Sequence, residues 1–313
     1  MNFIREIFSI PFGYLIGFFY SMSGNYLLSL FLMTLVVKLI LIPSSIKQQK
    51  GMAKTQRLQP KINRIREKYG SNQVKMQEEM NNLYAREGYS SMTSGCTSML
   101  IQLPVMMGVY LVNYRILSYV LRIPKETVEV IKNAVRALNL EKFNEYQIEL
   151  LALEHFKELD LTGVPTEFVD KISTFTNEFS IFGVDLATTP NIHMGATLLW
   201  LIPVLTGVTT LAMGLYTYIR QIKMNPDMAK NPSMGCMSLM SPVMSIWFSF
   251  MFPASVGVYI IMSTVLSFIQ MVILNHTHSP EKVLARMMVE ETINNRAREE
   301  IFKNVNDTLD KDD

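Results

Sequence analysis

Five long apolar stretches alternate with polar segments along the chain. Each stretch is long enough, or nearly so, to cross a hydrocarbon core about 30 Å thick as a helix. The last two stretches are separated only by residues 252–255, where Pro253 is the expected break between two helices. The pattern predicts an all-α, polytopic membrane protein with five transmembrane helices, built from the apolar stretches 25–42, 97–120, 196–219, 236–251 and 256–273.

The polar segments between these stretches complete the predicted organisation. A helical hairpin is expected after the first transmembrane helix, because apolar residues recur at helical spacing on both sides of a turn at residues 70–72. The predicted parts are an external interfacial amphipathic helix (1–24), transmembrane helices (25–46, 96–120, 193–219, 236–251 and 256–274), a cytoplasmic helical hairpin (47–95), an external helical insert (121–192), a cytoplasmic loop (220–235) and a cytoplasmic tail (275–313).

Composition and charge support a membrane class and set an orientation. Hydrophobic residues make up 49% of the chain, and the mean hydropathy of +0.19 is typical of a membrane protein. The segments 47–95, 220–235 and 276–313 hold 19 Lys and Arg residues, against 8 in the segments expected on the opposite side. The positive-inside rule therefore predicts an external N-terminus and a cytoplasmic C-terminus. No Arg- and Ser-rich transit peptide is apparent, which favours a multi-pass protein of a bacterial plasma membrane.

Lys38 is the candidate site residue with the clearest physical signal. It lies within an apolar run, roughly 20 Å along the first predicted span from Asn25 at the helical rise. An ammonium at such a depth costs at least about 2.5–3.5 kcal/mol. We therefore expect Lys38 to face a wet cavity or a polar partner, while snorkelling to the cytoplasmic headgroups is the alternative. No Asp or Glu occurs in the five predicted spans, so a buried ion pair is not expected.

Polar residues of other predicted spans are candidates to line the same cavity. Gln102 lies in the cytoplasmic half of the second span. Serines of the fourth span share one helix face, with Ser238, Ser241 and Ser245 as candidate groove residues. Close packing of helices through small hydroxyl residues explains the same serine pattern without a cavity.

The predicted hairpin carries a basic stripe. It holds ten basic and four acidic residues, and the docking candidates, Arg57, Lys61, Arg64 and Lys68, recur at helical spacing. One interpretation is a docking surface for anionic lipid, a ribosome or a targeting factor. The other is a solvated helix pair whose positive charge only enforces the orientation.

Several motifs, in order and with regular spacing, resemble the YidC/Oxa/Alb family of membrane protein insertases. The resemblance covers about 240 residues and is carried by residues 24–26, 34–43, 101–105, 200–210, 241–244 and 252–254, followed by Tyr259, Ser263 and Gln270. It implies a hydrophilic groove in the inner leaflet, with the first-span cation at Lys38 and with Gln102 and Trp200 lining it. The family generally has arginine where this chain has Lys38, which keeps the charge but loses the bidentate fork.

The resemblance also implies a function and a set of partners. Polar client segments would pass through the groove, and client transmembrane helices would be released into lipid, either independently of Sec or with the Sec translocon. The implied partners are nascent membrane proteins and the lipid bilayer. The Sec translocon, the ribosome and the signal recognition particle receptor are further candidate partners. Sequence-specific binding of nucleic acid is not expected. No cofactor, metal or catalytic residue is needed.

Three competing classes are separated by particular residues. A small polytopic transporter or channel is the alternative, but such proteins usually carry acid–base relays or inverted repeats within their spans. An intramembrane enzyme is disfavoured because the four histidines lie outside the five apolar stretches and neither G-x-S-x-G nor H-E-x-x-H occurs. A purely structural scaffold would tolerate replacement of Lys38 by leucine.

Overall fold

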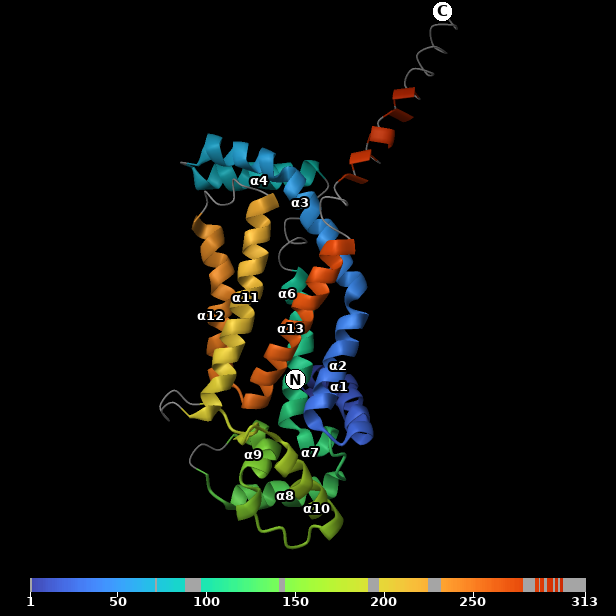
Figure 1. The fold of residues 1–313 in the computed structure, drawn as a ribbon, viewed down its shortest axis with the longest axis vertical. Coiled ribbons are helices and arrows are strands. Elements are labelled where there is room, and N and C mark those ends of the chain that lie inside the picture. The colour runs from blue at the N-terminus through green and yellow to red at the C-terminus, as the bar shows by residue number, and fades with distance from the viewer. Residues whose placement is uncertain are drawn as a thin grey trace, which may run out of the picture. The chain divides into compact units, whose positions relative to one another are not determined.

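The computed structural model describes residues 2–70, 72–87, 97–140, 144–190, 197–224 and 232–277, with short stretches between 285 and 300 (Figure 1). Side chains at 2–8, 52–57, 59, 97–103, 224, 232–239 and 241 lie outside the described set. Contacts divide the chain into two compact units. The first is Met1–Ile40 with Leu100–Ile269, and the second is Leu41–Met99 with Gln270–Asp313.

The first unit begins with two helices packed against each other. They are α1 (Asn2–Ser23) and α2 (Tyr26–Ile40). Gly24 lies between them with a φ of +64°, in the left-handed region that glycine adopts without steric cost. Its N–H donates to the Tyr20 carbonyl at 2.9 Å, which closes the end of α1. The chain can therefore reverse over two residues.

The next helix, α6 (Thr97–Tyr114), packs closely on α1 and is followed by the short α7 (Ile116–Tyr119). A Cβ at Gly108 would lie 2.3 Å from Cδ2 of Phe12, so only glycine allows this approach of α6 to α1. Tyr26 of α2 is 1% exposed and donates its hydroxyl proton to Asn113 of α6. These contacts hold α1, α2 and α6 together around one apolar core.

The insert folds as a small helical layer. It contains α8 (Lys125–Ala137), α9 (Ile148–Glu154) and α10 (Thr166–Glu178), with 3-10 turns η1 (Glu145–Gln147) and η2 (Phe156–Glu158). The apolar stripe of α8 repeats every three or four residues, and its members, Val128, Ile131 and Val135, are all buried. Strands β1 (Ser180–Ile181) and β2 (Val184–Asp185) follow as an antiparallel hairpin. The expected all-α fold therefore holds apart from these two short strands.

Three helices complete the apolar part of the chain. The turn η4 (Leu198–Trp200) leads into α11 (Leu201–Met224), which packs along α12 (Pro232–Met251). The last is α13 (Ala254–Thr277). In the described residues, two helices are long and apolar enough to cross a membrane, Leu198–Lys223 and Ala254–Thr277. A third span is added if the bent pair Tyr26–Ile40 and Ile42–Gly51 is one crossing. The predicted number of five spans remains a prediction.

The second unit contains a pair of packed helices, α3 (Ile42–Tyr69) and α4 (Gln73–Arg86). Leu58 and Ile62 of α3 are 4% and 3% exposed, as their spacing on one helix face predicts. Asn72 caps α4 by accepting a hydrogen bond from the Lys75 N–H at 3.1 Å. The pairing of α3 with α4 thus follows from an apolar stripe and a capped turn.

The first predicted transmembrane segment, 25–46, is not one straight helix. It breaks at Leu41, and the helices on either side are inclined by 51°. Pro43 lies in the first turn of α3, where its missing N–H is tolerated, but it cannot continue the hydrogen bonding of α2. The helix that forms the basic hairpin therefore begins at Ile42, before the predicted start at residue 47.

Candidate functional site

Lys38 has a specific polar partner on another helix. Its ammonium, near the end of α2, donates to Ser267 Oγ of α13 at 2.7 Å. The Ser267 hydroxyl in turn donates to the Ser263 carbonyl at 2.7 Å, one turn earlier in α13. Because its proton is used in that bond, Ser267 presents lone pairs to Lys38. The contact is charge-assisted and has a fixed direction.

The Lys38–Ser267 contact lies at the edge of a packed region. Thr34, one turn before Lys38, is 2% exposed, and Ser263 is 6% exposed. Lys38 itself is partly buried, whereas Leu39 and Ile40 are 55% and 68% exposed. The ammonium is therefore neither enclosed in the core nor free on an apolar surface. Snorkelling does not by itself explain a bond to a neighbouring helix.

Lys38 has no acidic partner in the part of the chain that the structure describes. The ion pairs found there lie in the α3–α4 pair and in the insert. A neutral hydroxyl satisfies one of the three ammonium donors and leaves the charge uncompensated. The arrangement suits a cation that attracts an anion from outside the helix bundle.

Trp200 lies far from Lys38 along the helices. Its ring contacts Phe250 edge-on, with centroids 5.2 Å apart, close to the turn between α12 and α13. Ser267 lies 13 residues into α13, which is about 20 Å at the helical rise. The Trp200 Nε1 is buried without a hydrogen-bond partner among the described residues. Trp200 and Lys38 therefore occupy different levels of the same unit.

The other predicted groove residues are placed only in part. Ser245 of α12 is partly buried, and Ser249, one turn later, is 1% exposed. A Cβ at Gly257 of α13 would lie 2.9 Å from Ser249 Oγ, so this serine sits at a close helix contact. That geometry agrees with the packing interpretation of the serine face. Side chains of three predicted residues lie outside the described set, namely Gln102, Ser238 and Ser241.

The basic residues of α3 differ in their contacts. Lys61 forms an ion pair with Glu87, which follows α4. Lys68 places its ammonium 5.2 Å from the ring centroid of Tyr69, and Arg64 is exposed. The Arg57 side chain lies outside the described residues. Part of the predicted docking stripe is thus used within the α3–α4 pair.

Further polar contacts join α3 to the last part of α13 within the second unit. Gln270 donates to Ser45 Oγ at 3.1 Å, and Gln49 donates to Asn275 Oδ1 at 3.2 Å. Amide side chains such as Gln270 and Asn275 are unusual in an apolar helix, so a sequence can point to them. Their hydrogen-bond partners depend on which helices pack together. These four residues and Ser267 were not predicted as site residues, and Gln270 entered only through the family resemblance.

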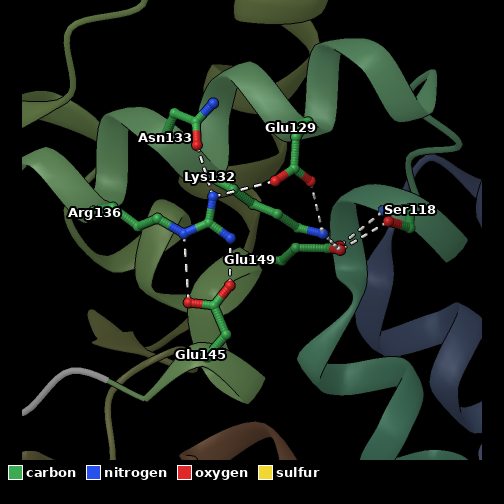
Figure 2. A network of polar contacts seen from close by, with 7 residues as sticks. All are labelled: Ser118, Glu129, Lys132, Asn133, Arg136, Glu145 and Glu149. Atoms are coloured by element: carbon green, nitrogen blue, oxygen red, sulfur yellow. Dashed lines mark hydrogen bonds and ion pairs between the residues drawn. The ribbon is translucent and has the colours of Figure 1, made fainter. Parts of the chain in front are cut away.

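The insert holds a dense charged network at its junction with α7 (Figure 2). Glu149 is 1% exposed and accepts bonds from the Ser118 N–H at 3.0 Å and the Ser118 hydroxyl at 2.8 Å. The Lys132 ammonium lies 3.6 Å from the same carboxylate. Arg136 binds Glu145, and this ion pair lowers the pKa of the Glu145 carboxyl. The network fixes α8 and α9 against the end of α7.

The fold and these polar contacts define the class of this protein. It is a multi-pass helical membrane protein with a partly buried cation beside an apolar helix bundle. The model of the 60Kd inner membrane protein family matches residues 18–282. The chain belongs to this family, and the resemblance seen in its motifs is confirmed.

Relatives named "Membrane protein insertase YidC" support the assignment. The protein from Clostridium perfringens is 37% identical over 114 residues, covering 35% of this chain and 48% of that protein. The protein from Brucella melitensis is 26% identical over 260 residues, covering 83% of this chain and 34% of that protein. The Aquifex aeolicus protein is 40% identical over 91 residues, covering 29% of this chain and 18% of that protein. The chain therefore matches less than half the length of these relatives.

Proposed function

We propose that this chain is a membrane protein insertase that uses Lys38 to draw polar segments of client proteins into the membrane. The observation that carries the proposal is the Lys38–Ser267 hydrogen bond, in which a cation is held by a hydroxyl and pairs with no carboxylate among the described residues. Family membership and the names of the relatives support it. The chain would work in a bacterial plasma membrane, with five spans, an external N-terminus and a cytoplasmic C-terminus.

The mechanism follows from the cost of crossing a dry core. A charged client residue at the bilayer centre costs at least about 2.5–3.5 kcal/mol, and a hydrated groove open to the cytoplasm would shorten the dry path. An acidic client residue that meets Lys38 displaces only the neutral hydroxyl of Ser267 from the ammonium, and it breaks no ion pair of Lys38 among the described residues. Release of the apolar client helix into lipid is driven by burial of about 0.8 kcal/mol per CH₂ group. No covalent chemistry is involved.

Clients are proposed to be nascent membrane proteins, inserted with or without the Sec translocon. The exposed part of the α3 basic stripe, including Arg64, would face a ribosome, the signal recognition particle receptor or anionic lipid. Groove residues proposed from the sequence besides Lys38 are Gln102, Trp200, Ser238, Ser241 and Ser245.

Substitution of Lys38 tests the proposal. Lys38→Ala should impair insertion of a client with an acidic translocated segment, while Lys38→Arg should retain insertion because the positive charge remains. The measurement is protease protection of the client in proteoliposomes that contain the purified full chain. A matched client whose acidic residues are replaced by Asn and Gln should be insensitive to Lys38→Ala.

Two outcomes would contradict the proposal. Equal insertion of the acidic client by the wild-type protein and the Lys38→Ala variant would remove Lys38 from the mechanism. A steady ion flux through the protein in empty liposomes, abolished by Lys38→Ala, would instead favour a channel.

A further inference from the structure

The strained tip of the β1–β2 hairpin has no role in the insertion mechanism above. The register pairs Ser180 with Asp185 and Ile181 with Val184, which leaves Phe182 and Gly183 as a two-residue turn. Both turn residues have positive φ, 50° for Phe182 and 80° for Gly183. Such a turn favours Asn, Asp or Gly at its first position, because a bulky side chain is strained there. A phenylalanine at this position needs a reason outside the turn.

Phe182 is also the most exposed of the large hydrophobic side chains described, at 86%. This exposure is not caused by loose packing of the residues that flank the hairpin. Phe179 and Leu186, on either side of the hairpin, are 1% and 0% exposed, and the Leu186 N–H donates to the Phe179 carbonyl at 3.1 Å. The hairpin therefore presents one aromatic ring outward from a rigid support.

The hairpin is joined to the ends of the apolar helices. The Ser255 N–H donates to the Leu186 carbonyl, and the Ala254 N–H donates to the Thr188 carbonyl, both at 3.0 Å. Ala254 and Ser255 begin α13, and β2 also packs against the turn η4 that leads into α11. Because Ile181 lies opposite Val184, Phe182 is about three residues beyond Leu186 along the hairpin, which is about 10 Å at the strand rise. The tip of the hairpin is therefore close to the first residues of α11 and α13, where these helices would enter the membrane.

Apolar surface continues beside this level. Leu198 and Leu201, at the start of α11, are 56% and 43% exposed. Aromatic residues are favoured at the boundary between headgroups and hydrocarbon, where an anchor enters about 5–10 Å. We propose that Phe182 is a membrane anchor, with its ring inserted into the headgroup boundary on the side of the membrane that carries the insert. The proposal depends on the fold and the membrane setting and does not depend on client insertion.

The test measures the depth of the tip in a bilayer. In the full chain with Cys96→Ser and Cys236→Ser, an environment-sensitive dye is attached at Phe182→Cys and the protein is placed in lipid nanodiscs. The dye should emit at shorter wavelength than in water and should be quenched by lipids spin-labelled near the headgroup, but not by aqueous iodide. The matched control is Val130→Cys, an exposed apolar position on the regular helix α8, where iodide should quench the dye.

A second variant removes the ring without harming the turn. Phe182→Asn suits a left-handed position, so the thermal unfolding midpoint should stay the same or rise. A dye at Ser180→Cys should become more accessible to iodide in the Phe182→Asn background than with Phe182 present.

Three results would overturn the anchor. The first is iodide quenching at position 182 as strong as at position 130. The second is a Ser180→Cys dye that Phe182→Asn leaves unchanged. The third is shielding at position 182 that appears only after another membrane protein is added, because the occupant would then be a protein and not the lipid.

Discussion

At the scale of single residues, the Lys38–Ser267 pair carries most of the functional argument. A hydroxyl is a weaker partner for an ammonium than a carboxylate, and it leaves the net charge available. The serine proton is committed to the Ser263 carbonyl, so Ser267 can serve Lys38 only as an acceptor. Ser267 is thus a positioning residue for Lys38.

Replacing Ser267 distinguishes a hydrated ammonium from a dry one. If water reaches Lys38, Ser267→Ala should lower the free energy of unfolding by about 1 kcal/mol, the net value of one hydrogen bond. If the surroundings of Lys38 are dry, an unpaired charge should cost about 3–5 kcal/mol. The measurement is reversible unfolding in bicelles, followed by tryptophan fluorescence.

The control for Ser267→Ala is Thr210→Val in α11. The Thr210 hydroxyl bonds only to carbonyls of its own helix in the described structure, including that of Thr206 at 2.6 Å. Removal of the Thr210 hydroxyl should change the free energy of unfolding only slightly, whether the surroundings of Lys38 are hydrated or dry. A large loss with Ser267→Ala and a small one with Thr210→Val would contradict the hydrated groove.

Lys38 could be found from the sequence, but its partner could not. A lysine in a run of Leu, Val and Ile is costly in a membrane, so its position alone indicates a special environment. Ser267 is one of many hydroxyl residues in the apolar stretches, and small hydroxyls are common at helix contacts. Its role depends on the register between α2 and α13, which local spacing does not contain.

At the scale of elements, the insert is held by the buried Glu149. Glu149→Gln keeps one acceptor for Ser118 but removes the negative charge that faces Lys132. The free energy of unfolding of the insert should fall by about 1–3 kcal/mol, the cost of weakening a buried charged hydrogen bond. Faster hydrogen exchange of the α9 amides would report this loss.

Glu145→Gln is the matched control for Glu149→Gln, because Glu145 belongs to the same network but its side chain is 54% exposed. A surface ion pair contributes little, so exchange in α9 should stay near the wild-type rate. Equal effects of the two substitutions would show that burial of Glu149 has no special importance.

Two partly buried carboxyls give the insert a pH dependence. Burial raises the pKa of Asp185 above its ordinary 3.8 and the pKa of Glu154 above its ordinary 4.5. Between the ordinary and raised values the folded state binds more protons than the unfolded state. The contribution of these groups to the free energy of unfolding therefore decreases as the pH rises through that window, and mild acid should stabilise the insert.

The measurement for this pH dependence is the thermal unfolding midpoint across the acidic range, with Asp185→Asn expected to flatten the profile. Asp160→Asn is a control of opposite sign, because hydrogen bonds from Thr162 lower the pKa of Asp160. Stabilisation by Asp160 is present above its ordinary pKa and is lost as the pH falls through the lowered value. An Asp185→Asn profile as steep as that of the wild type would contradict the assignment.

Elements were predictable where periodicity was regular. The three- and four-residue repeat of Val128, Ile131 and Val135 predicts α8 and its buried face. The β1–β2 hairpin was not predicted, because Phe182-Gly183 is not one of the turn sequences that signal such a hairpin. The break at Leu41 was also missed, since Pro43 lies just past the end of the apolar stretch 25–42, and the length of the segment 25–46 suggested one helix.

At the scale of the whole molecule, charge predicts which segments share a side of the membrane. In a chain with Cys96→Ser and Cys236→Ser, Thr162→Cys in the insert should react with a membrane-impermeant maleimide in intact cells stripped of any outer wall. Asn81→Cys on α4 should react only after permeabilisation. This labelling pattern is expected because segments rich in Lys and Arg are retained in the cytoplasm. The reverse pattern would invert the proposed orientation.

The proline that interrupts the first span has a consequence for solvent. Pro43 lacks an N–H, so the Leu39 carbonyl loses the donor that a continuous helix would supply four residues later. A main-chain oxygen without a donor is costly in hydrocarbon, and water is the simplest group that can satisfy it. Leu39 directly follows Lys38. The kink therefore favours a small hydrated defect beside the ammonium, which the backbone would maintain even when no client is bound.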